Sequence, residues 1–327
     1  MVSLLLILFC QTEVQSNYNH VVLISIDGLR SDALLVQHSI KFKNIKRILS
    51  GASTLNARTD NIYTETLPNH TGMLTSRLSN GDNKHGWHEN TTPPQDAKLK
   101  MKSVFSVTHA ANIFSSLNAS KEKFVLFRQS WGKEISDYLV EKDGQKQLNH
   151  LIKNFDKEKD KKSFHFLHLM DPDVAGHMYG WDLSTNSQYL KSIFEVDTLI
   201  GQLFQYLETI PDVMQKTAIV LTSDHGGGAP FRNHHGIGHV WVNYIIPFAV
   251  WTGDGAAKGE LIELNKDIFQ DPGIRDPTPN KDIKPVLRNA DAGNLCLQLL
   301  GLPPIPKSTR NFEQNLRIKP IKSIKSE

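Results

Sequence analysis

The sequence predicts an α/β protein in which helices cover both faces of a mostly parallel central sheet. Short apolar runs alternate along the chain with longer amphipathic stretches, and strands that are separated by helices usually form parallel sheets. The chain has 327 residues, of which 39% are hydrophobic and 22% charged, so it can bury one large core with insertions. We therefore expect a three-layer sandwich.

The individual elements follow from the spacing of apolar residues. Strands are expected at 20–26, 123–127, 163–170, 217–223 and 244–251. Helices are expected at 104–117, 186–210 and 289–301, the last of which closes on Gly301. The lysine-rich stretch 156–162 is typical of a solvated loop or a helix end.

The first sixteen residues, MVSLLLILFCQTEVQS, have the pattern of a secretory signal peptide without the usual basic start. The alternative is a buried first strand or helix. With the signal peptide at 1–16, the rest of the chain, 17–327, is expected to form a single domain in a secreted or periplasmic protein. Cys296 is then the one remaining cysteine, so no disulfide framework is expected. No later segment reaches transmembrane length.

The charge pattern argues against a nucleic-acid polymer as partner. The net charge is only +3, and the lysines are scattered along the chain or occur in short segments. A nucleic-acid surface normally needs a clustered basic face.

Three aspartates stand just beyond the carboxyl ends of expected strands, and ligands collect at that edge of an α/β sheet. They are Asp27, Asp173 and Asp224. His177 follows one of them by four residues and His225 follows another directly, while His234 or His235 lies nine or ten residues further on. Mixed aspartate and histidine ligation suits zinc. So many candidate ligands indicate two ions, an arrangement used for phosphoryl transfer.

Thr66 is the candidate nucleophile of this site. It stands two residues before Pro68 at the start of a plausible helix, where free backbone N–H groups would favour a bound phosphate and a threonine alkoxide. Simple helix capping by Thr64 or Thr66 explains the same residues. The residues alone leave both interpretations open.

The chain resembles the alkaline phosphatase superfamily, and within it the type I phosphodiesterase/nucleotide pyrophosphatase branch. The resemblance rests on VVLISIDGLRSDAL, TLPNHTGMLTS, DPDVAGHMYG, TSDHGG and NHHG, which occur in the order typical of that superfamily. It spans about residues 20–305. The expected fold is therefore alkaline-phosphatase-like.

The resemblance also implies the roles of individual residues around two Zn²⁺ ions. Asp27, Asp224 and His225 would hold one zinc, which also activates Thr66. Asp173, His177 and His235 would hold the other, so that His234 and His239 are not ligands. Asn90 matches an asparagine that donates to a phosphoryl oxygen, although its spacing from Thr66 is slightly longer here.

The expected activity is zinc-dependent hydrolysis of a phosphodiester or nucleotide pyrophosphate through a phosphothreonine intermediate, with a small phosphate ester or nucleotide as substrate. Lys121 and Lys123 resemble a pair that monoesterases and phosphonate hydrolases use to bind extra phosphoryl charge, so a monoesterase or phosphonoacetate-hydrolase-like enzyme is the alternative. Tyr63, Trp87, Trp131 and Tyr179 could form an aromatic slot for a nucleotide. A non-catalytic relative that binds a ligand is the alternative of a different class.

Overall fold

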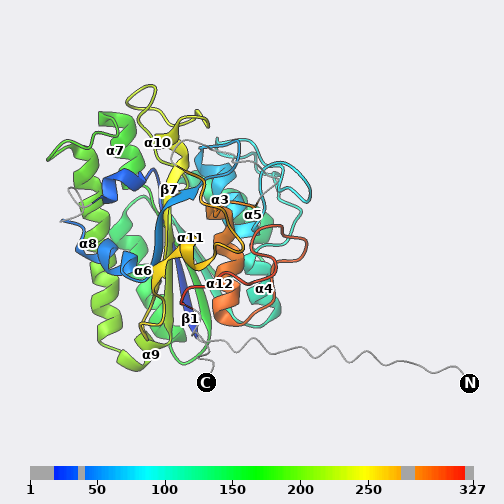
Figure 1. Cartoon of the computed structure of the whole chain (residues 1–327). Helices are drawn as coiled ribbons and strands as arrows, with labels where there is room; N and C mark the ends of the chain where they lie inside the picture. The colour runs from blue at the N-terminus through cyan, green and yellow to red at the C-terminus, as the bar shows by residue number, and fades with distance from the viewer. Residues whose placement is uncertain (1–17, 36–40, 274–283, 321–327) are drawn as a thin grey trace, which may run out of the picture.

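The computed structural model describes residues 18–35, 41–273 and 284–320 (Figure 1). The strands in these ranges form a single sheet of eight. The strand order is β4-β3-β5-β1-β6-β7-β2-β8. The proposed signal peptide, 1–16, lies outside the described residues. Only β7 runs antiparallel to its neighbours, which confirms the expected mostly parallel sheet.

The strands are β1 (His20–Ile26), β2 (Ala52–Arg58), β3 (Phe114–Ala119), β4 (Asp137–Val140), β5 (Ser163–Leu169), β6 (Thr217–Thr222), β7 (Ile245–Thr252) and β8 (Gly259–Glu260). The helices and short 3-10 turns (η) are η1 (Ser31–Leu34), α2 (Lys43–Leu49), α3 (Thr66–Thr75), α4 (Val104–Ala110), η2 (Glu122–Phe124), α5 (Val125–Trp131), α6 (Gly144–Glu158), α7 (Asp171–Tyr179), α8 (Gln188–Glu208), α9 (Pro211–Gln215), α10 (Trp241–Tyr244), α11 (Leu261–Leu264), η3 (Asn289–Asp291) and α12 (Ala292–Leu300).

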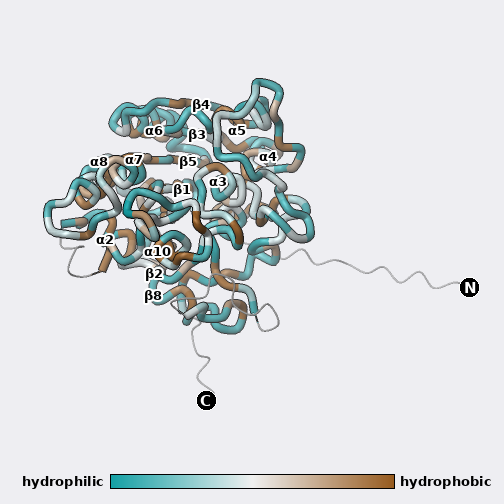
Figure 2. Tube along the Cα trace, turned by 90° about the horizontal axis from the view of Figure 1, so that it is seen from above, coloured by the Kyte–Doolittle hydropathy of each residue, from teal (hydrophilic) through white to brown (hydrophobic). Residues whose placement is uncertain are grey.

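Helices cover both faces of the sheet, as a three-layer sandwich requires. Figure 2 shows α2, α6 and α8 on one side of the sheet and α3, α4 and α5 on the other. Successive side chains of β1 point to opposite faces of the sheet and so pack into two different cores. Val21 and Leu23 pack into the core under α3, α4 and α5. Val22 and Ile24 pack into the core under α2, α6 and α8. Buried strands of this kind are hydrophobic on both faces.

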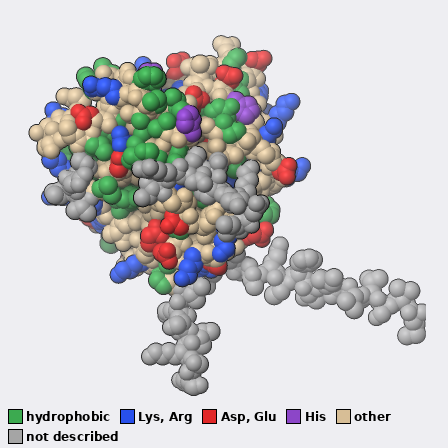
Figure 3. Space-filling model, turned by 45° about the horizontal axis from the view of Figure 1, so that its top comes forward, with side chains coloured by type: hydrophobic (Ala, Val, Ile, Leu, Met, Phe, Trp, Pro, Cys, Tyr) green, Lys and Arg blue, Asp and Glu red, His purple; other side chains and the backbone are tan. Residues whose placement is uncertain are grey.

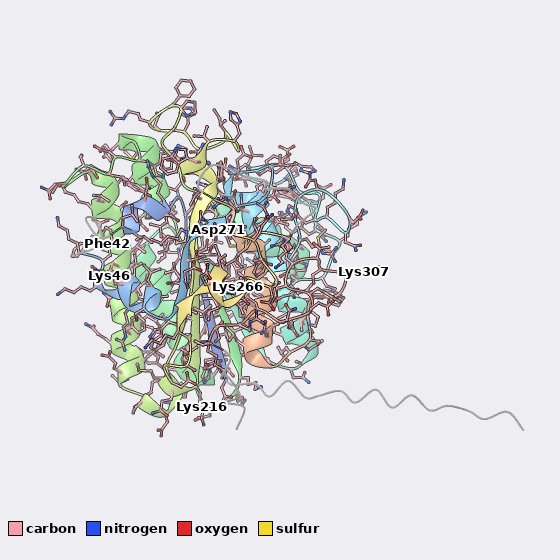
Figure 4. The ribbon with its side chains drawn as sticks, viewed as in Figure 1. Phe42, Lys46, Lys216, Lys266, Asp271 and Lys307 are labelled. Atoms are coloured by element: carbon pink, nitrogen blue, oxygen red, sulfur yellow. The ribbon has the colours of Figure 1, made fainter. Side chains whose placement is uncertain are left out.

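Helix α2 shows how a single element fits this scheme. Phe42, Ile45 and Ile48 recur at helical spacing and are buried, whereas Lys46 is exposed; Figure 4 labels Phe42 and Lys46. The apolar stripe therefore faces the sheet and the lysine faces solvent.

Two expected elements are wrong. The helix expected at 104–117 ends at Ala110, and its second half is strand β3. The turn between them includes Asn112 at a φ of 55°, and β3 carries buried polar residues that conceal its strand pattern. The strand expected at 123–127 is instead η2 and the start of α5, because a short apolar run fits a buried helix as well as a strand.

The other expected strands and helices are confirmed within three residues at each end. Of the charged stretch 156–162, the first residues form the end of α6. Cys296 is buried in the core and is a free thiol among the described residues. Within the described ranges, no helix combines the length and the apolar character that crossing a bilayer demands.

Candidate active site and metal centre

The site lies at the edge of the sheet where the parallel strands β1, β5 and β6 end. Asp27 follows β1 directly, and its neighbour Gly28 has a φ of 70°. A Cβ atom at Gly28 would lie 2.9 Å from the Asp173 Cα atom. Glycine is therefore required both for the left-handed turn and for the close approach of the segment after β5.

Asp224 and His225 follow β6 and form a first ligand group with Asp27. The Nε2 atom of His225 lies 3.4 Å from Asp27 Oδ1 and 3.3 Å from Asp224 Oδ2. The second oxygen of Asp224, Oδ1, accepts hydrogen bonds from the backbone N–H groups of Gly28 and His225. Oδ2 is therefore the atom that faces the other two ligand atoms.

Asp173 and His177 lie one turn apart on α7 and form a second ligand group with His235. The Nε2 atom of His177 lies 3.4 Å from Asp173 Oδ1 and 3.2 Å from His235 Nε2. His235 Nε2 lies 3.8 Å from Asp173 Oδ1. Zinc–nitrogen bonds of about 2.0–2.1 Å in tetrahedral geometry place ligand atoms roughly 3.3 Å apart, so both groups have dimensions suited to one zinc ion each.

The two groups adjoin each other through a pair of stacked rings. His225 and His235 have ring centroids 3.7 Å apart and an interplanar angle of 8°. Gly226 allows this return of the chain, because a Cβ there would lie 2.0 Å from the Val242 carbonyl oxygen. Asp173 can also join His225 and His235 in a single ligand group, but its Oδ1 lies farther from His225 Nε2, at 3.9 Å, than from His177.

Backbone carbonyl groups fix the tautomer of all three candidate histidine ligands. The Nδ1–H group of His225 donates to Gly226 O, that of His235 to Thr64 O, and that of His177 to Asn233 O. Each Nε2 therefore carries its lone pair toward the site. Burial and the stacked His225 lower the pKa of His235 to about 3, so its ring is neutral near pH 7, as metal ligation requires.

The candidate ligands fit a metal because four of their six inward-facing atoms are buried and unsatisfied. Within the described residues no hydrogen-bond partner exists for Asp27 Oδ1, Asp173 Oδ1, Asp224 Oδ2 or His225 Nε2. Burial and the neighbouring Asp27 carboxylate raise the pKa of Asp224 well above its usual value. Buried carboxylates in such numbers need cations, and this donor set is one that zinc accepts.

Lys121 supplies part of that positive charge. Its ammonium group lies 2.6 Å from Asp27 Oδ2 and 2.6 Å from Asp173 Oδ2, and it donates to Thr66 Oγ1 over 3.2 Å. Burial alone would lower the pKa of Lys121, but the carboxylates of Asp27, Asp173 and Asp224 outweigh burial and raise it. Lys121 is therefore a fixed positive charge between the two ligand groups.

Thr66 is the first residue of α3, and its hydroxyl group does not cap that helix. The N-cap residue is Glu65, with no side-chain cap hydrogen bond, and the Thr64 hydroxyl donates instead to the carbonyl oxygen of His235. Simple capping, the alternative that the sequence left open, is therefore not what these threonines do. The Thr66 hydroxyl group accepts from Lys121 at the boundary between the two ligand groups.

Asn90 lies next to the residue that follows Thr66, and hydrogen bonds to its side-chain oxygen hold it in place. Asn90 Oδ1 accepts from the Leu67 backbone N–H at 2.9 Å and from Lys123 Nζ at 3.0 Å. Because the oxygen is engaged, the amide Nδ2 group remains to donate to a phosphoryl oxygen. Lys123 thus contacts Asn90, whereas Lys121 contacts the carboxylates.

Sequence reasoning missed the residues that hold the ligands. His168, inside β5, donates from Nε2 to Asp27 Oδ2 at 2.8 Å, and its Nδ1 accepts from the Ser120 backbone N–H. His70 donates to the Thr66 carbonyl oxygen from Nδ1 and accepts from Ser25 at Nε2. For His168 the available signal was a histidine inside a buried apolar strand, which requires a buried hydrogen-bond partner.

Several other candidates lie away from the ligand groups. His234 and His239 are exposed, and His234 Nδ1 bonds to the side chain of its neighbour Asn233. Trp131 is buried against Phe127 and is a core residue, so it cannot form an aromatic slot.

The chain is similar in sequence to a much longer enzyme. The chain is 26% identical over 307 residues to GPI ethanolamine phosphate transferase 1 of Candida glabrata, a match that covers 84% of this chain and 31% of that enzyme. The chain therefore spans about a third of that relative's length.

Solved structures share the fold. Murine ectonucleotide pyrophosphatase/phosphodiesterase 5, in an inactive form with AMP, is 19% identical with a TM-score of 0.51, over 63% of this chain and 56% of that chain. An alkaline phosphatase superfamily protein from Vibrio parahaemolyticus is 12% identical with a TM-score of 0.60, over 92% of this chain and 71% of that one. At such identities the likeness shows an alkaline-phosphatase-like fold.

The family assignment follows from the sequence comparison. The model of the type I phosphodiesterase/nucleotide pyrophosphatase family matches residues 80–245, about half of the chain. This segment includes Asn90, both lysines and every candidate aspartate and histidine ligand except Asp27, whereas Thr66 lies outside it. Together with the buried aspartate and histidine groups, the match identifies the chain as a member of the type I phosphodiesterase/nucleotide pyrophosphatase family.

Proposed function

We propose that the protein is a zinc-dependent hydrolase of phosphoric esters that uses Thr66 as a covalent nucleophile. The observation that carries the proposal is the contact of the Thr66 hydroxyl group with Lys121, which bridges two adjoining Asp/His groups that hold four buried, unsatisfied ligand atoms. Asp27, Asp224 and His225 would hold one Zn²⁺, and Asp173, His177 and His235 the other. Bound zinc would supply Lewis-acid stabilisation of phosphoryl and alkoxide charge.

The protein's own residues account for the remaining steps. The Thr66 hydroxyl group loses its proton to solvent and its Oγ1 atom attacks phosphorus. The bond to the leaving ester oxygen then breaks, that oxygen takes a proton from solvent, and a phosphothreonine ester remains. Lys121 donates a hydrogen bond to Thr66 Oγ1, which stabilises its alkoxide form without a general base. Asn90, held by Lys123 and Leu67, donates from Nδ2 to the phosphoryl oxygen. Water then cleaves the phosphothreonine and frees Thr66.

Phosphodiesters and nucleotide pyrophosphates are the substrates we favour. Lys121 is already engaged by two carboxylates, whereas Lys123 is hydrogen-bonded to the neutral amide oxygen of Asn90. The pair therefore offers at most one positive charge that no carboxylate shares, while a dianionic monoester carries two negative charges. The family's description and the AMP bound to the murine enzyme support the same class. A monoesterase or phosphonoacetate-hydrolase-like activity requires one of these lysines to exchange its partner.

A second candidate function is transfer of phosphoethanolamine. It is favoured by the similarity to an enzyme named GPI ethanolamine phosphate transferase 1. The chemistry differs only in the second half, where an alcohol of an acceptor, in place of water, takes the phosphoryl group from Thr66.

The test compares wild type with Thr66→Ala and Thr66→Ser on bis-p-nitrophenyl phosphate. We expect Thr66→Ala to lose at least about 10³-fold in kcat/KM while it keeps its bound zinc, because the nucleophile alone is removed. Thr66→Ser retains a hydroxyl group and should keep measurable activity. Mass spectrometry of wild type quenched during turnover should show one added p-nitrophenyl phosphoryl group on the peptide that carries Thr66, because only one of the two p-nitrophenol groups has left. Full activity in Thr66→Ala would remove Thr66 from the chemistry.

A further inference from the structure

Trp181 is a buried side chain that packs against the second ligand group. It is 3% exposed and follows α7, the helix of His177. Its Nε1–H group donates to the carbonyl oxygen of Gly28, next to Asp27, over 2.9 Å. Its ring makes edge-to-face contacts with His177 and His235, at centroid distances of 5.1 and 5.8 Å. The indole therefore touches both histidines of the second ligand group.

Two segments that carry ligands have glycines where they pass the indole. A Cβ atom at Gly176, directly before His177, would lie 2.3 Å from Trp181 Cε2. A Cβ atom at Gly227, two residues after His225, would lie 2.4 Å from the same atom. Side chains cannot approach so closely, so the backbones of α7 and of the loop after β6 pack directly on the ring. The size of the indole thus sets the distance between these two segments.

The backbone of Trp181 is itself held on both sides. Its N–H group donates to the Arg232 carbonyl oxygen over 3.0 Å, and its carbonyl oxygen accepts from Arg30 Nη1 over 3.1 Å. Arg30 in turn forms an ion pair with Asp32. A side chain that is locked in this way can hold the histidine rings that it touches in one orientation.

His177 is the ligand that depends most on this support. Its side chain is 46% exposed, whereas that of His235 is 8% exposed. Figure 3, which turns the end of the molecule with α7 and α10 forward, shows histidine side chains at the surface beside hydrophobic ones. A ring that reaches solvent needs contacts on its buried side to keep Nε2 directed toward a metal.

We propose that Trp181 is a positioning residue: its indole orients His177 and His235 so that the second ligand group binds zinc tightly. This inference rests on the proposed function, because it needs a metal at that group. A core residue without this role would stabilise the fold as a whole. A positioning residue instead changes the affinity of one metal site.

The first ligand group has supports that do not involve the indole. The Gly28 carbonyl oxygen, next to Asp27, also accepts from the Tyr189 hydroxyl group at 2.7 Å. In the loop after β6, the Gly226 N–H group donates to the Asn243 carbonyl oxygen at 2.8 Å. Loss of the indole should therefore weaken the zinc ion of the second group and leave that of the first group bound.

The experiment titrates zinc into the zinc-free protein in competition with a chromophoric chelator. The binding step that His235→Ala lacks identifies the second ligand group. Trp181→Leu removes the aromatic ring, and Trp181→Phe keeps a smaller one. The matched control is Trp251→Leu, which removes the same atoms from the same buried cluster, where Trp251 packs on Phe204. Circular dichroism measures whether each variant is folded.

We expect Trp181→Leu to weaken binding of the second zinc at least about tenfold, because residues that orient metal ligands typically contribute that much. The first zinc should keep its wild-type affinity, Trp181→Phe should recover part of the loss, and Trp251→Leu should bind both zinc ions like wild type.

An unchanged second zinc in Trp181→Leu, or equal weakening of both zinc ions, would overturn the inference. Should Trp181→Leu fail to fold, the comparison of Trp181→Phe with Trp251→Phe decides in the same way, by a loss at the second zinc alone. A wild-type protein that binds fewer than two zinc ions would instead overturn the two-metal site of the proposed function.

Discussion

His168 shows how one side chain outside the candidate ligand groups can set the strength of the metal site. Its Nε2–H group holds Asp27 Oδ2, which leaves Asp27 Oδ1 directed toward His225. Residues that orient ligands in this way typically contribute 10–100-fold to metal affinity. We therefore expect His168→Ala to weaken zinc binding by about that factor, as measured by competition with a chromophoric chelator.

The matched control is His168→Gln, because its amide group can still donate toward Asp27. It should restore most of the zinc affinity that His168→Ala loses. Equal affinity in wild type and His168→Ala would show that His168 only fills space in the core.

The sequence shows which residues are ligand candidates, but not how they are held. Asp27 and Asp224 stand where buried strands end, so their position was predictable from apolar runs. The role of His168 was not, since a histidine inside a strand is more often a satisfied core residue. The choice of Nε2 in His177, His225 and His235 depends on carbonyl groups that only the folded chain brings near.

Strands and helices were predictable where their apolar pattern is unbroken. β1, β5, β6 and β7 are buried along their whole length, and their sequences are nearly continuous apolar runs. β3 was missed because it carries the polar residues Ser115, Ser116 and Asn118. The side chains of Ser116 and Asn118 can be buried because other elements supply their hydrogen-bond partners, His165 and His150.

A buried hydrogen-bond chain crosses β1, β5 and β3. His20 donates from Nε2 to the Lys159 carbonyl oxygen and accepts at Nδ1 from the Ser163 hydroxyl group. The Ser163 hydroxyl oxygen in turn accepts from His165 Nε2. His165 Nδ1 accepts from the Ser116 hydroxyl group. Every donor has an acceptor only if both rings are neutral. Burial lowers the pKa of His20 to about 4 and that of His165 to about 3.

This hydrogen-bond chain predicts that the folded protein loses stability in mild acid. The folded pKa of His20 lies below the usual value of 6.5, so the unfolded state takes up a proton first as the pH falls. The stability that neutral His20 provides is therefore complete above pH 6.5 and is lost between pH 6.5 and about 4, by roughly 3 kcal/mol.

Urea unfolding at pH 7.0, 5.5 and 4.5, in the presence of a chelator, measures this loss. The free energy of unfolding of His20→Gln should fall less over this range than that of wild type, since glutamine does not titrate. Parallel decreases in the two proteins would contradict a neutral, buried His20.

The site exists only in the folded chain, because its carboxylates come from three distant segments that the sheet brings together. Folding therefore concentrates negative charge, which Lys121 and the proposed metals offset together.

We expect Lys121→Met to lower the free energy of unfolding by about 3 kcal/mol in the zinc-free protein, where it leaves buried carboxylates unpaired. With zinc bound the loss should be smaller. Denaturant unfolding with and without a chelator measures the loss in the zinc-free and in the zinc-bound protein. Lys123→Met is the control. Equal losses in the zinc-free and zinc-bound protein would be inconsistent with Lys121 as a charge partner of the carboxylates.

The most direct test of the account counts zinc per chain by inductively coupled plasma mass spectrometry after dialysis. Wild type should hold two zinc ions per chain, and His235→Ala should hold one, because it breaks only the group with Asp173 and His177. His234→Ala, which changes an exposed neighbour, should still hold two. A wild-type protein without stoichiometric zinc, or a loss in His234→Ala equal to that in His235→Ala, would contradict the two-metal site.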